Sequence, residues 1–459
     1  MKRAIALLFI CGCLSSIFAQ MPANTPENIK KYTGICKTNI YKEMKGMYRE
    51  AGGALKFPFL APGSAQYLDM LWDWDSWLSN VALKQILLEN GSDKDKQQAV
   101  QYEEGCVLNF LHYGGMDGWI PIWIERNAPS RDEMLSKINP WKSNMHKPQL
   151  AQHAAFITKC QNGDAEWLRE DFYRLQSFVD KYLNFHRNKA TGLLYWETDV
   201  AIGVDNDPST FFRPNESSGS IFLNVFMYKE LKAMAYLANC LHQQDIARTY
   251  ELESSKLKDA IQANCWDQRD GFFYSVDFNL RPVEKPDIAT LTPGMLIFHV
   301  GQPRNYDCLI QRFDVWSGFL PMWSEIATPE QAKRMVLQHY KDTASFNAPA
   351  GIRTLSKQEK MYNVRASGNP SSWQGPVWII SNYLVFRGLV NYKYNDEAKE
   401  LAQKTILLLG RDYERFGALH EYYLPDNGEP VLNKGFQNWN LLVLNMIAWL
   451  DGKPIITEF

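Results

Sequence analysis

Acidic side chains set among aromatic rings are the residues of this chain whose types and spacing could carry chemistry. The piece WDWDSW at 72–77 interleaves two carboxylates with three indoles, and Glu421 lies in the piece HEYY at 420–423. Two further pieces lie between them, GVDNDP at 203–208 and SWQGPVW at 372–378. Two carboxylic acids can cut a glycosidic bond, and flat rings stack on the apolar faces of sugars. The pattern therefore favours hydrolysis of a glycoside.

Each of these pieces also has a structural interpretation. Asp75 could cap a helix over the apolar run 78–88, because an aspartate there can accept a hydrogen bond from a free helix N–H. The acids at 197–207 could be ordinary turn residues, and the tryptophans could fill the core. Each piece alone is weak evidence for a site, and their occurrence together is the stronger signal.

Several familiar chemistries have no anchor in the chain. It contains no phosphate-binding GxxxxGK(S/T), no dinucleotide-binding GxGxxG after a strand, no HExxH and no GxSxG. Its eight histidines are scattered and form no metal cluster, so we expect neither a catalytic metal nor another cofactor, and a structural calcium ion stays open. With 49 basic and 51 acidic residues and no basic run, we expect no binding to nucleic acid or to an acidic membrane surface.

The first 19 residues have the pattern of a secretory signal peptide. Lys2 and Arg3 precede an apolar run at 4–13, and small residues lead to a cleavage site after Ala19. An alternative is a bacterial lipoprotein, in which the piece ICGC would make Cys13 a lipid anchor. No later segment reaches the ~18 apolar residues that a membrane-spanning helix needs. We therefore expect an exported protein without a transmembrane span.

Six cysteines follow this leader, and their spacing is not that of a zinc site. In an exported protein they could form one or two disulfides or remain buried free thiols, and the sequence leaves both outcomes open. The six are Cys36, Cys106, Cys160, Cys240, Cys265 and Cys308.

Helices must position most of these side chains. No linker divides residues 20–459, so a single domain is expected there. Helical periodicity or a helix start signal occurs at 164–182, 220–237, 328–331, 377–390 and 438–450. Short strands are predicted at 193–196, 272–276 and 419–423. Many helices joined by long polar and aromatic loops indicate an all-α solenoid or a closed toroid with its loops at one end.

Taken in order, these pieces resemble glycoside hydrolase family 63, which includes processing α-glucosidases and mannosylglycerate hydrolases and is related to trehalases. The resemblance runs from about Trp72 to Asp451. It implies an (α/α)6 barrel of paired helices, short β-hairpins at the active-site mouth, and hydrolysis with inversion of anomeric configuration. It rests on the pieces WDWDSW at 72–77, GVDNDP at 203–208, SGFLPMWSEIATPEQA at 317–332, GIRTLS at 351–356, WQGPVW at 373–378 and HEYYLPDNGEP at 420–430.

The resemblance also implies a role for individual residues. Asp205 matches the general acid and Glu421 the general base that activates water. Asp75 matches a ligand of substrate hydroxyls, and Arg353 could hold either a loop or a hydroxyl. The residues that would line the sugar subsite are Trp72, Trp74, Trp373, Gln374 and Trp378.

The chain departs from the family's common residues at a few places. These are Asp207, Ser209, Glu325 and the piece HKPQ at 146–149, which we expect around the leaving-group subsite. The preference for a leaving group therefore does not carry over. The expected activity is that of an exported, metal-independent, inverting and exo-acting α-glycosidase, acting on an α-glucoside or a short oligosaccharide.

Three alternatives remain open on the sequence. One is a trehalase- or mannosylglycerate-type hydrolase with a narrow substrate range. Another is a carbohydrate-binding toroid without catalysis, against which the retention of acids at 205 and 421 speaks. The third is a polysaccharide lyase on a similar toroid, which would normally use a Tyr/His or Tyr/Arg set as its base. The oligomeric state is not predicted.

Overall fold

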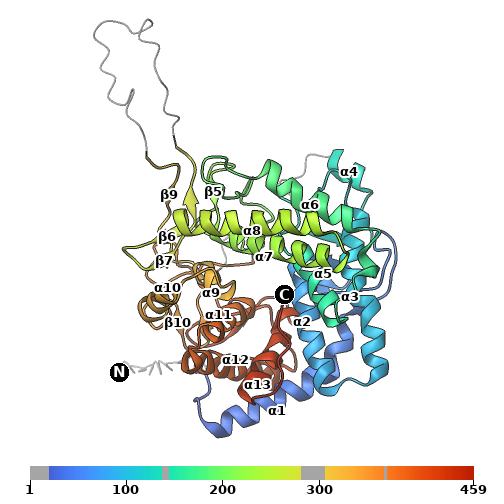
Figure 1. The fold of residues 1–459 in the computed structure, drawn as a ribbon. Coiled ribbons are helices and arrows are strands. Elements are labelled where there is room, and N and C mark those ends of the chain that lie inside the picture. The colour runs from blue at the N-terminus through green and yellow to red at the C-terminus, as the bar shows by residue number, and fades with distance from the viewer. Residues whose placement is uncertain (1–19, 137–143, 281–304, 366–369) are drawn as a thin grey trace, which may run out of the picture.

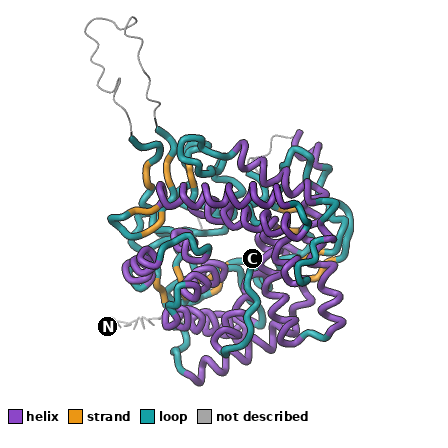
Figure 2. The backbone as a smooth tube through the Cα atoms, in the orientation of Figure 1, coloured by secondary structure: helices purple, strands orange, loops and turns teal. Residues whose placement is uncertain are grey.

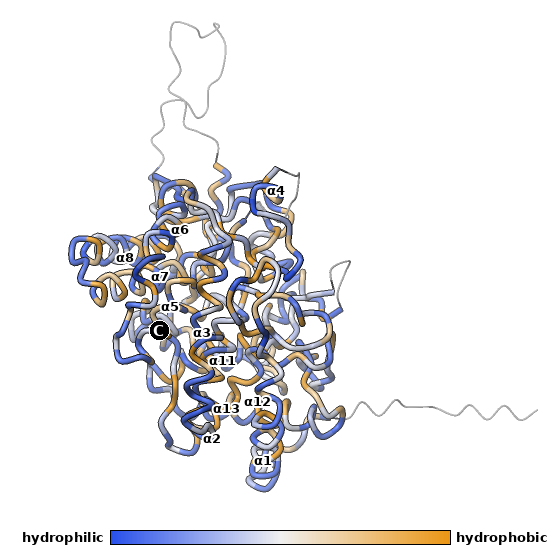
Figure 3. The backbone as a smooth tube through the Cα atoms, turned by 90° about the vertical axis from the view of Figure 1, so that its right-hand side faces the viewer, coloured by the Kyte–Doolittle hydropathy of each residue, from blue (hydrophilic) through white to orange (hydrophobic). Residues whose placement is uncertain are grey.

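Buried helices alternate with amphipathic ones along the computed structural model, which describes residues 20–136, 144–280, 305–365 and 370–459. In α2 (Asp73–Asn90) 14 of 18 residues are buried, whereas α8 (Gln244–Cys265) buries only 6 of 22. A helix that is buried on all sides belongs inside a protein, and one with a single apolar stripe covers it. Figure 3 shows hydrophilic and hydrophobic residues alternating along the outer helices α1 and α8.

Within the described residues, six helical segments form an inner ring. They are α2 (Asp73–Asn90), α5 (Leu150–Cys160), α7 (Ile221–Cys240), α9 (Leu320–Trp323), α11 (Ile379–Asn391), and the 3-10 turn η8 (Asn438–Leu442) continued by α13 (Val443–Leu450). Each contacts the next one along the chain, and η8 contacts α2, so the ring is closed.

Six outer helical segments in the described part of the chain cover this ring. They are α1 (Pro26–Glu43), α3 (Asp93–Tyr113), α6 (Phe172–Phe185), α8 (Gln244–Cys265), α10 (Pro329–Arg334) continued by a π-helix (Met335–Tyr340), and α12 (Asn395–Phe416). A short helix, α4 (Arg131–Ser136), lies in the connection after α3. Figure 1 shows α7 and α8 packed side by side, and α1 against α12 and α13. The fold is the (α/α)6 toroid that the resemblance implied, and the closure left open by periodicity is now established.

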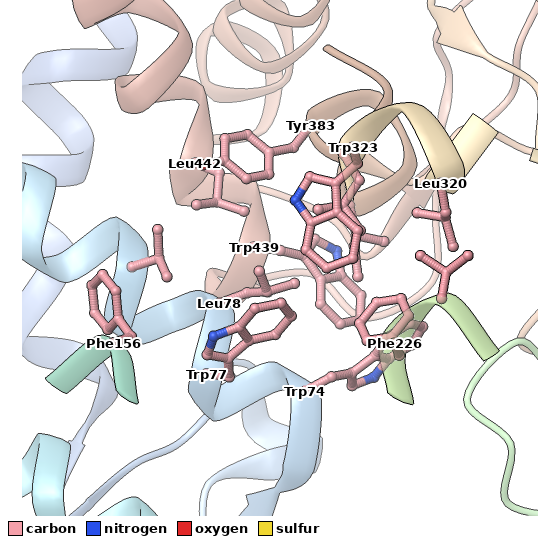
Figure 4. Close-up of a cluster of buried hydrophobic side chains, with 14 of the residues drawn as sticks. Trp74, Trp77, Leu78, Phe156, Phe226, Leu320, Trp323, Tyr383, Trp439 and Leu442 are labelled. Carbon is pink, nitrogen blue, oxygen red and sulfur yellow. The ribbon is translucent and has the colours of Figure 1, made fainter. Parts of the chain in front are cut away.

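Aromatic side chains from different inner helices meet inside the ring (Figure 4). The ring centre of Trp77 lies 6.1 Å from that of Phe226 and 6.3 Å from that of Trp323. Phe156 of α5, Tyr383 of α11 and the fully buried Leu442 of η8 belong to the same core. Phe, Trp and Tyr make up 13% of the chain, and many of these rings therefore fill a core.

The helix start predicted at 328–331 is confirmed, whereas the helix predicted from residue 164 begins only at Phe172 (α6). Ser220 provides a further cap. Ser220 caps α7 by accepting a hydrogen bond from the backbone N–H of Leu223. Thr328 and Gln331 form a reciprocal capping box at the start of α10, with Pro329 at the first helical position. In both cases the side-chain oxygen satisfies an N–H that has no partner within the helix.

The strands are two or three residues long and lie within the loops (Figure 2). They are β1 (Tyr48–Arg49), β2 (Phe59–Leu60), β3 (Met70–Trp72), β4 (Trp123–Glu125), β5 (Ser218–Gly219), β6 (Trp266–Asp267), β7 (Phe272–Phe273), β8 (Val276–Asp277), β9 (Leu309–Ile310), β10 (Asn347–Ala348), β11 (Gly351–Ile352), β12 (Tyr422–Tyr423) and β13 (Pro430–Val431). The pairs are antiparallel: β1–β2, β3–β4, β5–β8–β9, β6–β7, β10–β11 and β12–β13. The strand predicted at 272–276 is found as two short strands, β7 and β8. Of the strand predicted at 419–423 only β12 is formed, and 193–196 forms only isolated bridges.

The C-terminal residues lie across the inner ring near the middle of the molecule (Figure 1). The buried carboxylate of Glu458 accepts hydrogen bonds from Trp323 Nε1 at 2.7 Å, from the Tyr383 hydroxyl at 2.8 Å and from Arg387 Nε at 3.1 Å. Burial alone would raise the pKa of Glu458, but the charge of Arg387 and these hydrogen bonds hold it below its usual value. The last residues therefore tie α9 to α11.

Three expectations concern features away from the pocket. All six cysteines after the leader are free thiols, so the disulfide alternative is not realised. Across the residues that the structure describes, no helix combines the length and the apolar character needed to cross a bilayer. The predicted signal peptide and Cys13 lie outside the described residues.

Candidate active site

A pocket of about 600 Å³, counting its open mouth, lies where the inner helices begin. Trp74 and Asp75 come from the first turn of α2, Trp378 directly precedes α11, and Trp439 lies in η8. The other lining residues come mainly from the segments that join an outer helix to the next inner helix. They are Tyr67, Trp72, Ile122, Lys147, Ala201, Gly203, Asp205, Ser371, Trp373, Glu421 and Phe436.

Asp205 and Glu421 line this same pocket, although one precedes α7 and the other follows α12. Glu421 is only 6% exposed. Burial and the charge of Asp205 raise the pKa of Glu421 to about 7, against hydrogen bonds from Asn433 and Tyr67 that lower it. The two acids are therefore close enough to influence each other's ionisation, which is a property of paired catalytic acids.

Two neutral donors hold the Glu421 carboxylate. The Tyr67 hydroxyl lies 3.3 Å from both carboxylate oxygens, and the Asn433 side-chain amide donates to Oε2 of Glu421. Asn433 also donates to the Tyr67 hydroxyl oxygen at 3.1 Å. The backbone of Asn433 is left-handed, with φ of 42°, a conformation that asparagine tolerates better than most residues. This arrangement fixes the orientation of the carboxylate.

The loop that carries Asp205 is tied to the WQG piece. Asn206 accepts a hydrogen bond from the backbone N–H of Trp373 at 2.9 Å through Oδ1, and one from Gln374 Nε2 at 3.2 Å through its carbonyl. Gly375 has φ of 133°, and a Cβ built on it would lie 2.4 Å from the Tyr362 ring, so the position requires glycine. Two segments far apart in the chain thus form one wall of the pocket.

Asp207, the second acid of this loop, has a different role from Asp205. Its Oδ1 accepts hydrogen bonds from the backbone N–H of Ser209 at 2.8 Å and from the Ser209 hydroxyl at 2.7 Å. Burial raises the pKa of Asp207, against these two hydrogen bonds. Asp207 is therefore the turn residue of the structural interpretation. The charge of Asp205 instead raises the pKa of the Glu421 carboxylate.

Four indoles form the aromatic wall. Trp373 stacks on Trp378 with ring centres 4.2 Å apart, and Trp74 lies 5.6 Å from Trp373 and 5.4 Å from Trp439. The Nε1 donor of Trp378 is used by the carbonyl of Ser372 at 2.8 Å. The buried Nε1 donors of Trp373 and Trp439 have no hydrogen-bond partner among the described residues. The wall therefore combines stacked apolar ring faces with indole N–H groups.

Asp75 also faces this pocket. Asn438 donates a hydrogen bond to its Oδ1, and Trp72, rather than Asp75, occupies the N-cap position of α2. The helix-cap interpretation of Asp75 is therefore wrong. Burial and the charge of Asp73 raise the pKa of Asp75 well above its usual value, while the charge of Lys147 lowers it.

Lys147, which lines the pocket, forms a buried ion pair with Asp73. The Lys147 ammonium lies 2.7 Å from Asp73 Oδ1, and both side chains are at most 1% exposed. Asp73 Oδ2 also accepts a hydrogen bond from the backbone N–H of Lys147 at 3.1 Å. The pair joins the first turn of α2 to the segment that precedes α5.

Most of the predicted site residues come together. The pocket is lined by Asp205, Glu421, Asp75, Trp72, Trp74, Trp373 and Trp378. Gln374 lies beside the lining and serves to hold Asn206. The expectation that Arg353 binds the substrate is wrong, because Arg353 lies outside the lining and its guanidinium holds loops. It donates to the carbonyls of Thr343, Ser345 and Asn347 and to Asp426 Oδ1.

Glu325 does not lie near the leaving-group subsite either. Its charge acts to raise the pKa of Lys229 and of Arg387, two residues that also interact with Glu458. Arg387 lies in the second half of α11, whereas the pocket is at the start of that helix. The expectation that Glu325 borders the substrate is therefore wrong.

Four residues of the site were missed as functional residues. Trp439 and Tyr67 lie in no acidic piece, and Asn433 follows the recognised hairpin by a few positions. The sequence signal at Lys147 is that HKPQ departs from the family's common residues. Position along the chain was the signal that could have found them. Each of the four residues lies between an outer and an inner helix or at the start of an inner helical segment. Among the described residues, no group of three or more His, Cys, Asp or Glu side chains is placed to hold a metal ion.

Comparison with known proteins agrees with this architecture. Residues 69–440 match the family model described as the mannosylglycerate hydrolase MGH1-like glycoside hydrolase domain. Mannosylglycerate hydrolase MGH1 of Selaginella moellendorffii is 26% identical over 419 residues, which cover 83% of this chain and 80% of that protein. The chain spans only 34% of a Schizosaccharomyces pombe relative named as a probable mannosyl-oligosaccharide glucosidase, at 23% identity over 66% of this chain.

Solved structures show the same fold. A GH63 mannosylglycerate hydrolase from Thermus thermophilus, determined with glucose, superimposes with a TM-score of 0.62 at 20% identity. The match covers 88% of this chain and 98% of that one. Neutral trehalase from Saccharomyces cerevisiae gives a TM-score of 0.57 at 16% identity, covering 84% of this chain and 73% of that one. With the family match over most of its length, the chain belongs to the mannosylglycerate hydrolase MGH1-like glycoside hydrolases of family 63.

Proposed function

We propose that this protein is an exported, inverting and exo-acting glycoside hydrolase that cleaves an α-glucosidic bond. Asp205 acts as the general acid and Glu421 as the general base. The observation that carries the proposal is the lining of one pocket by both carboxylates together with five indole rings. A pocket that receives a chain end, rather than an open groove, favours exo action.

The surroundings of Glu421 suit a base. Tyr67 and Asn433 both donate to its carboxylate and so stabilise the ionised form, which is the form that accepts a proton from water. Burial and the charge of Asp205 oppose this effect and raise the pKa of Glu421 to about 7, so its carboxylate is ionised above that pH. The reaction needs Glu421 in this ionised form and the proton on Asp205.

The reaction uses the two groups on opposite faces of the sugar. Asp205 gives its proton to the glycosidic oxygen while the bond from that oxygen to the anomeric carbon breaks. Glu421 removes a proton from a water molecule whose oxygen forms the new bond to the anomeric carbon. Such a mechanism needs the carboxyl groups roughly 6.5–9.5 Å apart, which leaves space for that water.

The remaining lining residues suit the recognition of a sugar. Asp75 offers carboxylate oxygens, and the Nε1 atoms of Trp373 and Trp439 offer donors. The indole faces supply apolar surface for the C–H faces of a pyranose ring. Donors, acceptors and flat apolar surface are thus all present within one small cavity.

A mannosylglycerate-type activity is the second candidate. It is supported by the description of the family model and by the names of the Selaginella and Thermus relatives. The lyase alternative has less support, because the described residues that line the pocket include neither histidine nor arginine. Trehalose, kojibiose, nigerose, maltose and mannosylglycerate form a panel that separates these activities.

The catalytic assignment is tested with conservative variants. Asp205→Asn and Glu421→Gln should each lower kcat on the best substrate of that panel at least about a thousandfold while the circular dichroism spectrum stays unchanged. Asp207→Asn is the matched control, because it alters an acid of the same loop whose carboxylate holds a turn. Activity of either pocket variant within tenfold of wild type would remove that residue from its role.

Export is proposed on the N-terminal pattern alone. A secreted form should begin at Gln20, as determined by mass spectrometry of the protein expressed with its natural leader. A lipid-modified Cys13 at the N-terminus would instead support the lipoprotein alternative. A protein that retains residues 1–19 would contradict both.

A further inference from the structure

We propose that Lys147 is a specificity-determining residue of the pocket, and that its ammonium donates a hydrogen bond to one hydroxyl of a neutral sugar bound there. The assignment rests on the proposed function, since it concerns the sugar that Asp205 and Glu421 would act on. It adds a cationic donor at a position where the sequence showed only a departure from the family.

The ammonium is held in a fixed position from several sides. Asp73 Oδ1 accepts its hydrogen bond at 2.7 Å, and the ring of Trp74 lies 4.8 Å from the Lys147 nitrogen. A Cβ built on Gly203 would lie 2.9 Å from Cε and 3.0 Å from Nζ of Lys147, so the Asp205 loop closes over the side chain. Gly203 itself lines the pocket. A lysine so confined has lost the mobility that usually makes it a poor specificity element.

The Lys147 ammonium has more N–H donors than the described residues use. It carries three N–H groups, and among the described residues its hydrogen-bond acceptor is Asp73 alone. The face of Trp74 attracts the cation but accepts no conventional hydrogen bond. A buried ammonium with free N–H groups is costly unless a ligand or water completes its shell. Because Lys147 lines the pocket, the group that completes it is one that enters the pocket.

The charge of the pocket decides which kind of group that is. Among the described lining residues Lys147 is the one basic side chain, and Asp73 already pairs with it. Asp75, Asp205 and Glu421 line the same cavity. A carboxylate on the bound sugar would therefore meet an excess of acidic groups, whereas a hydroxyl can accept from the ammonium without that cost. The geometry points to a neutral hexose rather than a uronic acid.

A purely structural role for Lys147 makes a different prediction. If the ion pair only fastened α2 to the segment before α5, its removal would weaken the binding of every sugar to the same degree. A donor to one hydroxyl instead loses its effect when that hydroxyl is absent from the ligand. Monodeoxy sugars therefore separate the two roles, as in a double-mutant cycle.

The experiment measures binding by calorimetry of D-glucose, D-mannose and D-glucuronate, followed by the 2-, 3-, 4- and 6-deoxy analogues of the tighter neutral sugar. Lys147→Met keeps the length of the side chain and removes its donors. Because that change leaves Asp73 buried without its cation, the double variant Asp73→Asn/Lys147→Met is measured in parallel. Lys84→Met is the matched control, since Lys84, elsewhere on α2, forms an ion pair at 2.7 Å with the fully buried Glu103 of α3.

We expect Lys147→Met and the double variant to weaken the parent sugar about tenfold, which is typical of one hydrogen bond to a charged group. For one of the four deoxy sugars, the Kd of both variants should lie within twofold of the wild-type Kd for that same sugar. Lys84→Met should leave the Kd of every sugar unchanged. Equal losses on all four analogues, or no loss on any sugar, would overturn the assignment and leave the proposed function standing. Tighter binding of glucuronate than of both neutral sugars would overturn it too. A wild-type protein that binds none of the sugars would overturn the proposed function and this assignment with it.

Discussion

The hydroxyl of Tyr67 lies 3.3 Å from each carboxylate oxygen of Glu421, so that a residue near the start of the described chain orients one near its end. Asn433 completes the arrangement by donating to both Glu421 and the Tyr67 oxygen. Burial and the charge of Asp205 raise the pKa of this carboxylate, whereas the hydrogen bonds from Asn433 and Tyr67 lower it. The ionisation of Glu421 is therefore set by a balance that single substitutions can move.

The first prediction concerns the pH dependence of the wild-type protein. A general base works in its ionised form, and the pKa of Glu421 is raised to about 7. We expect kcat/KM to fall about tenfold per pH unit below that value, as measured on the best substrate with buffers of constant ionic strength. An acid limb near pH 4.5 would instead show that Glu421 titrates as an exposed glutamate does.

Removal of the Tyr67 hydroxyl should move that acid limb. Its hydrogen bond lowers the pKa of Glu421, so Tyr67→Phe is expected to shift the limb to higher pH and leave the high-pH plateau within about tenfold of wild type. The measurement is the full pH profile of kcat/KM rather than activity at one pH. An unshifted limb with a uniformly lower rate would mean that Tyr67 acts only on substrate binding.

The raised pKa of Glu421 also has a consequence for stability. A carboxyl whose folded pKa of about 7 exceeds its unfolded value near 4.5 stabilises the fold fully below the unfolded value, and this contribution is lost as pH rises through the folded one. Glu421→Gln, which stays neutral, should therefore be more stable than wild type at pH 8, by on the order of 2 kcal/mol, and about equal to it at pH 4. Urea unfolding at the two pH values measures this, and an equal difference at both would contradict it.

Arg353 provides a test of the distinction between the site and its support. Its guanidinium donates to three backbone carbonyls and to Asp426, and the side chain is 2% exposed. Arg353→Met should cost about 3 kcal/mol of unfolding free energy, because it leaves buried carbonyls without donors, while KM of the folded protein stays within twofold. A tenfold rise in KM with unchanged stability would return Arg353 to the substrate site.

The sequence predicted the elements whose signals are local. Ser220 and Thr328 mark helix starts through their own side chains, and the acid of HEYY is recognisable from its neighbours. Closure of the ring depends on contact between η8 and α2, which no short pattern encodes. Periodicity predicted an all-α solenoid or toroid, and the (α/α)6 barrel followed from the resemblance.

The residues of the site divide in the same way, into those with a local sequence signal and those without one. Asp75, Asp205 and Glu421 belong to recognisable pieces, whereas Tyr67 becomes functional only because folding brings it to Glu421. Arg353 shows the converse, since a charged residue in a recognisable piece proves to hold loops. Residue type and neighbours predict which groups could react, and only the tertiary structure shows which of them share a cavity.

The central claim is tested most directly by the configuration of the first sugar released. Proton NMR recorded within the first minutes of hydrolysis of an α-glucoside should show β-glucose before mutarotation produces the α anomer, because water attacks from the face opposite the leaving group. Initial release of α-glucose would contradict the assignment of Asp205 as acid and Glu421 as base.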